Sequence, residues 1–274
     1  MPFPNAERVL YRKNTLENVI CQLRFPPILR IDAAPPAEFQ ERIRGAFPGF
    51  RQVPLVEAQF PPDIAATLPP DLMGTIPPEI FKHVFAGPQG NKNYEFSSED
   101  GFSQINLTST FIALSTKRYA RWEEFKARLQ IPMDALLDVY HPAYFTRIGL
   151  RYMNLIRRSA LGLEGTEWRE LLSPFITGVL GAREIAHQVK GLQQLYEIQL
   201  EDGRAMVKVL TTLVRPIDKG EESFLIDSDF SDPHKTDFGV AMERLDYLNA
   251  RASRLIRWAI TDRLHDAMEP QSIV

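Results

Sequence analysis

A short motif that occurs twice constrains the fold of this 274-residue chain more than any other feature. Residues 94–101 (YEFSSEDG) and 196–203 (YEIQLEDG) both place Tyr-Glu ahead of Glu-Asp-Gly at the same spacing. Residues 23–25 (LRF) are echoed in the same way by residues 150–152 (LRY). Asp-Gly between alternating apolar residues is a strong signal for a β-hairpin turn. The repeats therefore predict two halves with the same order of elements, each with a hairpin that turns at Asp-Gly.

The hydrophobic pattern assigns elements to each half. In the first half it predicts a strand within 17–31, a short helix with Phe39, Ile43 and Phe47 on one face, strands near 52–59, 80–86, 93–98, 102–108 and 111–116, and a helix from about 121 that Pro132 kinks. In the second half it predicts a strand at 143–157, a short helix capped by Thr166, strands near 182–190, 194–201, 204–213 and 222–230, and a final helix at 237–267. The two halves then share one plan, with one extra strand in the first.

These elements predict an α+β fold in which two tandem β-α-β(4)-α halves form a curved antiparallel sheet with helices on one face. This arrangement resembles that of the TATA-box-binding protein at the level of the fold, and function does not follow from such a resemblance. The expected boundaries are 1–140 for the first half, which contains a proline-rich insertion at 60–78, and 141–274 for the second. The halves form either one continuous domain or two α+β domains of unrelated topology.

The insertion at residues 60–78 (FPPDIAATLPPDLMGTIPP) repeats Pro-Pro every eight residues. Proline lacks a backbone donor and fixes φ, so this stretch can be neither a helix nor an inner strand. The apolar side chains between the proline pairs are Ile64, Leu68, Leu72 and Ile76. The insertion is either a loop that packs on its own domain or an arm that binds a partner through these four side chains.

Charge and cysteine content exclude several classes of protein. The formal net charge is -3 and the sequence pI is about 6.0, so the basic excess typical of nucleic-acid binders is missing. The single cysteine, Cys21, cannot form an intrachain disulfide, and no apolar run reaches the ~20 residues of a membrane helix. The first residues lack the apolar segment of a signal peptide. We therefore expect a cytoplasmic protein that binds neither nucleic acid nor membrane.

The sequence carries no motif for catalysis or for a cofactor. It has no phosphate-binding glycine loop, no nucleophile elbow and no paired cysteines, and its five histidines lack metal-site spacing. Cys21 alternates in phase with apolar residues of its strand, which favours a buried thiol over a nucleophile. Asp232 before Pro233-His234 is better explained as a capping turn than as a catalytic pair. We therefore predict no catalytic residue, no metal and no cofactor.

Charged residues of both signs gather on the polar faces of the predicted strands, because alternate residues of a strand share a face. These residues are Arg24, Arg147, Arg151, Glu197, Asp227 and Asp229. If helices cover the other face of the sheet, the six side chains line one polar groove whose arginines could bind an anion bidentately. The alternatives are a lattice of cross-strand ion pairs on a solvated face and a metal site built from carboxylates.

Further motifs occur along nearly the whole chain. They are CQLRF at 21–25, FQxxIRxxFP at 39–48, FxxxDG at 96–101, FxALxTxxYxxWExF at 111–125, TRIGLRYxN at 146–154 and ITD at 260–262. Together they resemble a sporadically distributed family of prokaryotic proteins of unknown function. The chain departs from that family in the proline-rich insertion and at Asn249, where the resemblance implies a histidine. The patchy distribution implies an accessory role, such as a partnership in a mobile defence or toxin–antitoxin-like system.

Three functional hypotheses follow from the sequence. The leading one is a non-enzymatic protein-binding or regulatory module that acts on a protein partner through its sheet face or its proline-rich arm. The second is a sensor of a small molecule or anion that uses the arginine-lined groove. The third is an enzyme whose site the sequence does not reveal.

Overall fold

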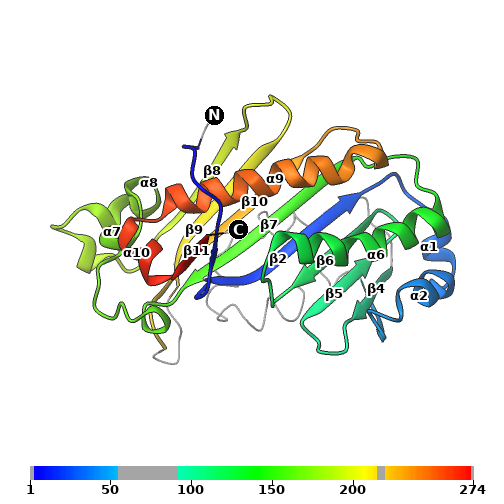
Figure 1. Ribbon diagram of the computed structural model, residues 1–274, viewed down its shortest axis with the longest axis horizontal. Helices are drawn as coiled ribbons and strands as arrows, with labels where there is room; N and C mark the ends of the chain where they lie inside the picture. The colour runs from blue at the N-terminus through cyan, green and yellow to red at the C-terminus, as the bar shows by residue number, and fades with distance from the viewer. Residues whose placement is uncertain (1–2, 55–91, 215–219, 273–274) are drawn as a thin grey trace. The chain divides into compact units, whose positions relative to one another are not determined.

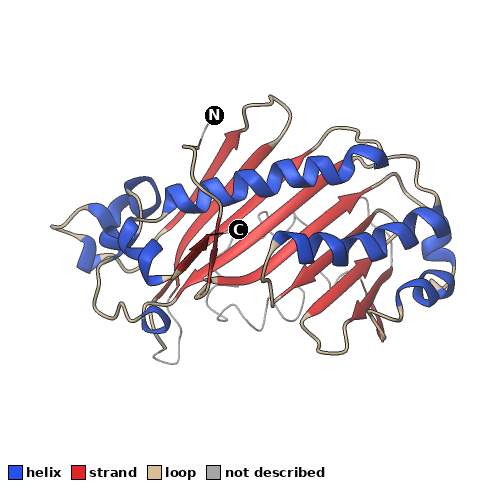
Figure 2. Cartoon of the chain, in the orientation of Figure 1, coloured by secondary structure: helices blue, strands red, loops and turns tan. Residues whose placement is uncertain are grey.

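The computed structural model describes residues 3–54, 92–214 and 220–272. It confirms the α+β class, because helices accompany a large antiparallel sheet (Figure 2). The chain forms two compact units. Unit 1 consists of Met1–Glu17, Arg151–Ser231 and Asp246–Val274, and unit 2 consists of Asn18–Leu150 and Asp232–Leu245.

Unit 2 contains most of the first half of the chain. Its elements are β2 (Leu16–Arg24), α1 (Leu29–Ala33), α2 (Ala37–Ile43), β3 (Gly49–Pro54), β4 (Lys92–Ser97), β5 (Ser103–Leu107), β6 (Phe111–Thr116) and α6 (Trp122–Tyr140). Helix α6 lies across one face of these strands (Figure 1), and α2 packs against it.

The apolar face predicted for the short helix after Pro35-Pro36 is confirmed. Phe39 and Ile43 of α2 and the following Phe47 are all fully buried. The ring of Phe39 lies 5.4 Å from that of Phe96 in β4 and 6.4 Å from that of Tyr140 in α6. Because residues four apart share a helix face, this spacing packs α2 into the space between the sheet and α6.

The second half of the chain supplies the remaining elements except β1 (Val9–Tyr11), which lies near the start of the chain. These are β7 (Arg147–Ile156), η2 (Ser159–Leu161), α7 (Trp168–Leu171), α8 (Pro174–Thr177), η3 (Gly178–Gly181), η4 (Ala186–Gln188), β8 (Gln193–Gln199), β9 (Met206–Val214), β10 (Ser223–Asp232), α9 (Phe238–Ala259), α10 (Asp262–Ala267) and β11 (Pro270–Ser272). Strands β1 and β11 pair with each other, and the other nine form one sheet in the order β3-β4-β5-β6-β2-β7-β10-β9-β8. Among the described strands, β3 and β8 are therefore its edges.

Both hairpins predicted at Asp-Gly are confirmed. Gly101, between β4 and β5, has φ +69°, and Gly203, between β8 and β9, has φ +68°. A side chain with a Cβ rarely adopts this left-handed conformation, which explains the glycine at both positions. In each turn the preceding aspartate accepts a hydrogen bond from a backbone N–H two residues on, at 3.0 Å in both cases.

One predicted strand is wrong. Residues 182–190 do not pair in the sheet and instead form a turn that contains η4. Their backbone groups bond locally, as in the contact from Ala186 N to Ala182 O at 2.9 Å. Local turns satisfy the same backbone groups that a strand would pair with a neighbour, and so they compete with the sheet.

The boundaries of two predicted helices also change. The final helix of residues 237–267 is divided into α9 and α10, because the backbone N–H of Thr261 donates to Leu171 O at 2.9 Å and the Thr261 side chain caps α10. Thr166 is not the N-cap of α7, a position that Glu167 occupies. Pro132 lies inside α6, which continues to Tyr140.

Several predictions lie outside the described residues. They are the strand at 80–86, most of the strand at 52–59, and the insertion at 60–78 with Ile64, Leu68, Leu72 and Ile76.

Helix α10 packs against the strand pair β1–β11 through an aromatic contact. The hydroxyl of Tyr11 lies 2.7 Å from Nδ1 of His265, with the two rings in a T-shaped arrangement. Burial, with the nearby charge of Arg257, lowers the pKa of His265, although Asp266 and Asp262 act in the opposite direction. Burial also raises the pKa of Tyr11 to about 12.

This contact predicts a pH dependence of stability. His265 binds a proton at a lower pH in the folded protein than in the unfolded chain. Protonation therefore favours the unfolded chain, and the free energy of unfolding should fall as pH decreases through about 6.5. His265→Gln keeps an acceptor for Tyr11 and removes the titration, so the variant should lose less stability between pH 7.5 and pH 5.5. Urea unfolding at the two pH values measures the difference, and equal losses in both proteins would contradict the prediction.

Within the described ranges, no helix has both the length and the apolar character that crossing a bilayer requires.

Candidate functional site

Arg151 and Asp227 form a buried ion pair on the face of unit 1's sheet that points away from α9. Tyr152 donates its hydroxyl to Asn249 of α9 at 2.8 Å, so its neighbour Arg151 points to the other face of β7. Nε of Arg151 donates to Asp227 Oδ1 at 2.7 Å, and a second contact joins Nη2 to Oδ2. Arg151 is 3% exposed and Asp227 is 5% exposed, which makes this a desolvated bidentate pair.

The third guanidinium nitrogen of Arg151, Nη1, has no hydrogen-bond partner in the described part of the chain. Burial by itself would lower the pKa of Arg151, but the charge and hydrogen bonds of Asp227, with the charge of Asp229, keep the pKa above its usual value. The guanidinium therefore stays charged, and its charge is already balanced within the sheet.

A second row of charges crosses the same face. Lys208 of β9 lies opposite Asp229 of β10 on one side and opposite Glu197 of β8 on the other. Its Nζ lies 2.8 Å from Glu197 Oε1. Four of the six residues predicted for the groove, Arg151, Glu197, Asp227 and Asp229, thus share one face of unit 1, where Arg151 pairs with Asp227 and Lys208 pairs with Glu197.

The other two predicted residues belong to unit 2. Arg24 Nε donates to Gln22 Oε1 at 2.8 Å, and Arg147 Nη1 donates to the same oxygen at 3.3 Å. The guanidinium of Arg147 lies over Gly149, in the space that a Cβ at this position would occupy. Two guanidinium groups therefore meet at one buried amide in unit 2.

Among the described strands, β8 lies at an edge of the sheet. One side of β8 pairs with β9, and the other side of β8 pairs with no described strand. Two flanking bonds, from Leu213 N to Leu192 O at 3.0 Å and from Leu200 N to Ala205 O at 2.8 Å, fix the pairing pattern. In an antiparallel pair every second residue bonds to the neighbour. The residues of β8 that direct their N–H and C=O groups away from β9 are Gln193, Leu195, Glu197 and Gln199.

These four outward groups have no backbone partner among the residues that the structure describes. Their side chains are exposed on the same face as the charge rows, and Leu195 is 49% exposed. Natural edge strands are commonly protected by proline, lysine or a bulge, and β8 contains no proline and no lysine.

The opposite face of β8 is held in place by α8. The Tyr196 hydroxyl donates to Phe175 O at 2.6 Å, and Gln194 Nε2 donates to Ile176 O at 2.9 Å. The exposed edge therefore belongs to a strand that is fixed on one face and open on its outer side.

The sequence reasoning missed Leu195 and Lys208. Lys208 could have been found from the hairpin at Asp202-Gly203, which places it opposite Glu197 once the turn length is fixed. Nothing in the sequence of β8 indicates that it is an edge, because the edge position depends on strands far away in the chain.

Other chemistry is weakly represented among the described residues. Burial raises the pKa of Cys21 well above its usual value, and nearby Arg147 only partly offsets this, so its thiol is unreactive. No group of histidine, cysteine and carboxylate side chains in the described ranges could hold a metal ion. Nδ1 of His234 lies 2.9 Å from the buried Asp232, but Arg244 also binds that carboxylate at 2.9 Å, and no nucleophile contacts the imidazole in the described part of the chain.

No protein-family model matches the chain, and no curated protein is similar to it in sequence. The resemblance to the sporadically distributed prokaryotic family therefore stays a prediction based on its motifs.

Proposed function

We propose that this protein is a protein-binding module that adds an extended segment of a partner protein to its sheet along the outer side of β8. The observation that carries the proposal is the row of outward backbone groups at residues 193, 195, 197 and 199. Strand addition to such an edge gives affinity through backbone hydrogen bonds and specificity through alternate side chains.

The charge row specifies the chemistry of the partner segment. Asp229, Lys208 and Glu197 alternate in sign toward the edge, so a basic residue opposite Glu197 would continue the alternation. The neighbouring cross-strand row on that face contains Leu210 and ends at the exposed Leu195 of β8. This arrangement favours an apolar partner residue beside Leu195. In an antiparallel partner the basic residue comes two positions before the apolar one, which gives the pattern Lys-x-Leu.

An anion sensor that uses the predicted groove is less well supported. The charges of Arg151 and Lys208 are already matched by Asp227, Glu197 and Asp229, so an anion would have to displace a carboxylate from each. An accessory role, as the family resemblance implies, is compatible with a module that binds one protein partner.

We test strand addition with two fluorescein-labelled peptides, Thr-Thr-Lys-Val-Leu-Thr-Thr and the same peptide with glutamate in place of lysine. The lysine peptide should bind more tightly to the natural chain, and Glu197→Lys should reverse the preference. Leu195→Pro removes one outward N–H without touching the bonds to β9, so it should weaken binding about tenfold. Leu195→Thr, which keeps the N–H, is the matched control and should weaken binding less.

Circular dichroism verifies that the variants fold. Failure of the lysine peptide to bind, or equal binding by folded Leu195→Pro, would overturn the proposal. Self-association that Leu195→Pro abolishes, seen by sedimentation without peptide binding, would instead assign the edge to a second copy of this chain and would also overturn it.

We also propose that the two halves of the chain are copies of one ancestral unit. One shared backbone conformation and one pair of equivalent contacts, all at residues of the repeated motif, support this idea. The turn glycines share one conformation, and Tyr94 donates to Ala34 O after α1 as Tyr196 donates to Phe175 O in α8. In an experimental structure, superposing one half on the other should bring the two tyrosines together, and a mismatch of their strands would refute the duplication.

A further inference from the structure

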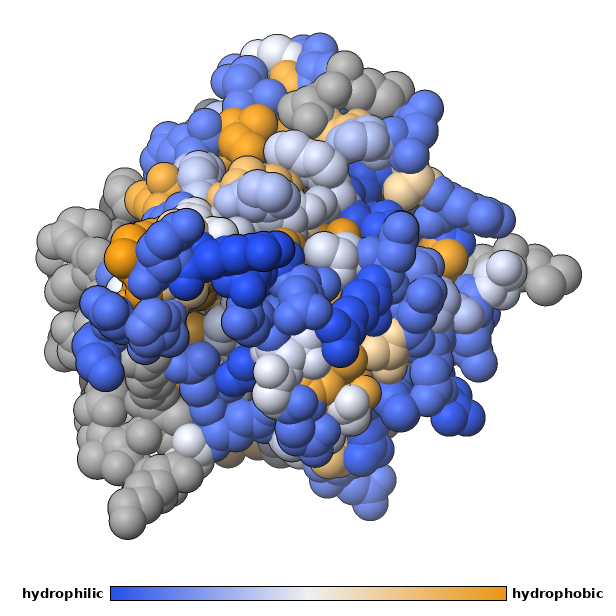
Figure 3. Space-filling model, turned by 90° about the vertical axis from the view of Figure 1, so that its left-hand side faces the viewer, coloured by the Kyte–Doolittle hydropathy of each residue, from blue (hydrophilic) through white to orange (hydrophobic). Residues whose placement is uncertain are grey.

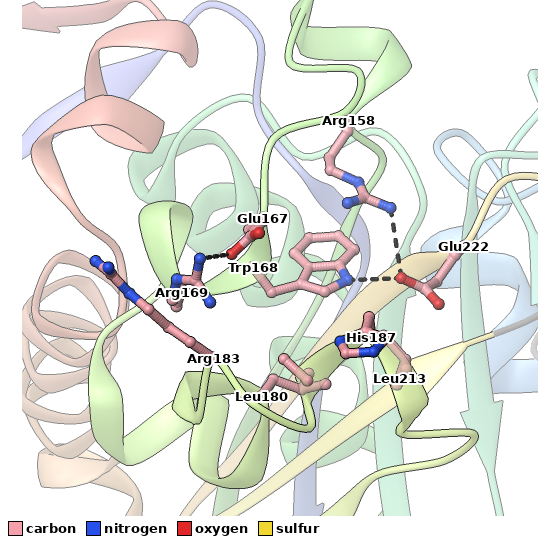
Figure 4. A pocket seen from close by; sticks show the side chains of 10 residues that line it. Arg158, Glu167, Trp168, Arg169, Leu180, Arg183, His187, Leu213 and Glu222 are labelled. Carbon is pink, nitrogen blue, oxygen red and sulfur yellow. Dashed lines mark hydrogen bonds and ion pairs between the residues drawn. The ribbon is translucent and has the colours of Figure 1, made fainter.

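We propose that unit 1 contains a second binding site, a basic pocket that takes a small organic phosphate. The pocket has a volume of about 290 Å³ (Figure 4). It lies among α7, the η3–η4 segment, the end of β9 and the start of β10. Arg158, Trp168, Arg169, Arg183, His187 and Glu222 line it. This proposal is independent of strand addition at β8.

One wall of the pocket is rigid. The guanidinium of Arg158 lies 4.3 Å from the centre of the Trp168 ring, and its Nη1 donates to Thr166 O at 2.8 Å. Glu222 accepts hydrogen bonds from Trp168 Nε1 at 2.9 Å and from Arg158 Nη2 at 3.4 Å. Because these groups hold one another in place, little conformational entropy is lost when a ligand binds against them.

The charges that line the pocket do not cancel. Three arginines face two carboxylates, those of Glu167 and Glu222. Glu167 pairs with Arg169, and Glu222 binds Arg158 weakly. Arg183 is exposed, and it makes no ion pair with any described residue. The lining is therefore left with one net positive charge.

This surplus is local, because the whole chain carries a net charge of -3. Figure 3 views the side of the molecule where α7 and α8 lie, and it shows strongly hydrophilic side chains across the middle of that face. Figure 4 shows the Trp168 ring between Arg169 on one side and Glu222 with His187 on the other.

The ligand class follows from charge and size. A phosphate monoester carries about -1.5 to -2 charges at neutral pH and three acceptor oxygens, which matches the guanidinium donors and their surplus charge. The remaining lining includes the apolar side chains of Leu180 and Leu213, which suit a small apolar body on the phosphate. A site of this volume suits a ligand of small-molecule size.

The test uses isothermal titration calorimetry of the full chain with phenyl phosphate, inorganic phosphate and benzoate at constant ionic strength. Phenyl phosphate should bind more tightly than the other two. Arg183→Gln should weaken it at least tenfold without unfolding the protein, because Arg183 has no ion pair to lose, and Arg169→Gln should also weaken it. Arg42→Gln removes the same charge from an exposed position on α2 of unit 2 and should leave binding unchanged.

Equal weakening by Arg42→Gln and Arg183→Gln would show a general charge effect and would overturn the site. Benzoate binding as tightly as phenyl phosphate would overturn the phosphate assignment. Absence of heat from phenyl phosphate in the natural chain would overturn the proposal altogether.

Discussion

Asp227→Ala should lower the free energy of unfolding by about 3–5 kcal/mol, because it leaves a buried charge without its partner. The substitution leaves the guanidinium of Arg151, which is 3% exposed, without the carboxylate that binds it at 2.7 Å. A charge that cannot reach water and has lost its counter-charge is far costlier than an ion pair is stabilising. Urea unfolding followed by circular dichroism measures the loss.

A substitution at a neighbouring carboxylate and a double variant distinguish the cost of leaving a buried charge unpaired from the cost of losing any carboxylate on this face. Asp229→Ala removes a less buried carboxylate from the same face of β10 and should cost less than about 1 kcal/mol. Replacing both partners, with Arg151→Met and Asp227→Leu, removes the buried charges together and should recover most of the stability. A loss below about 1 kcal/mol for Asp227→Ala would show that Arg151 is solvated.

Phe39→Ala should lower the free energy of unfolding by about 3–5 kcal/mol through a different mechanism. Phe39 is fully buried between the ring of Phe96, at 5.4 Å, and that of Tyr140, at 6.4 Å. Truncation removes buried apolar surface and leaves a cavity that the surrounding side chains cannot fill. Thermal or urea unfolding provides the measurement.

The matched control for Phe39 is Leu29 in α1, which is 76% exposed. Leu29→Ala removes an apolar side chain of similar type from the surface and should change stability by no more than about 0.5 kcal/mol. Similar losses in the two variants would mean that α2 does not pack as described.

Local pattern was sufficient for the elements whose residues determine their own conformation. Spacing by four placed Phe39 and Ile43 on the buried face of α2, and Asp-Gly located both hairpins, because these signals act through neighbours in the chain. The same reasoning failed at residues 182–190, where mixed apolar and charged residues fit a strand as well as a series of turns. In the structure the backbone groups of this segment bond locally, as turns.

The candidate sites depend on contacts that the sequence does not encode locally. Arg151 and Asp227 are 76 residues apart in the chain, and strand pairing alone brings them together. The basic pocket gathers Arg158, Arg169 and Arg183 from separate short segments, none of which forms a motif.

By itself the sequence determined the α+β class, the two Asp-Gly hairpin turns and the buried face of α2. Only the tertiary structure decided the order of strands, and with it the exposure of β8 and the neutralisation of the predicted arginine groove. The physical reason is the range of the forces. Backbone conformation and amphipathic periodicity are set within a few residues, whereas the choice of an edge strand or of an ion-pair partner depends on where distant segments pack.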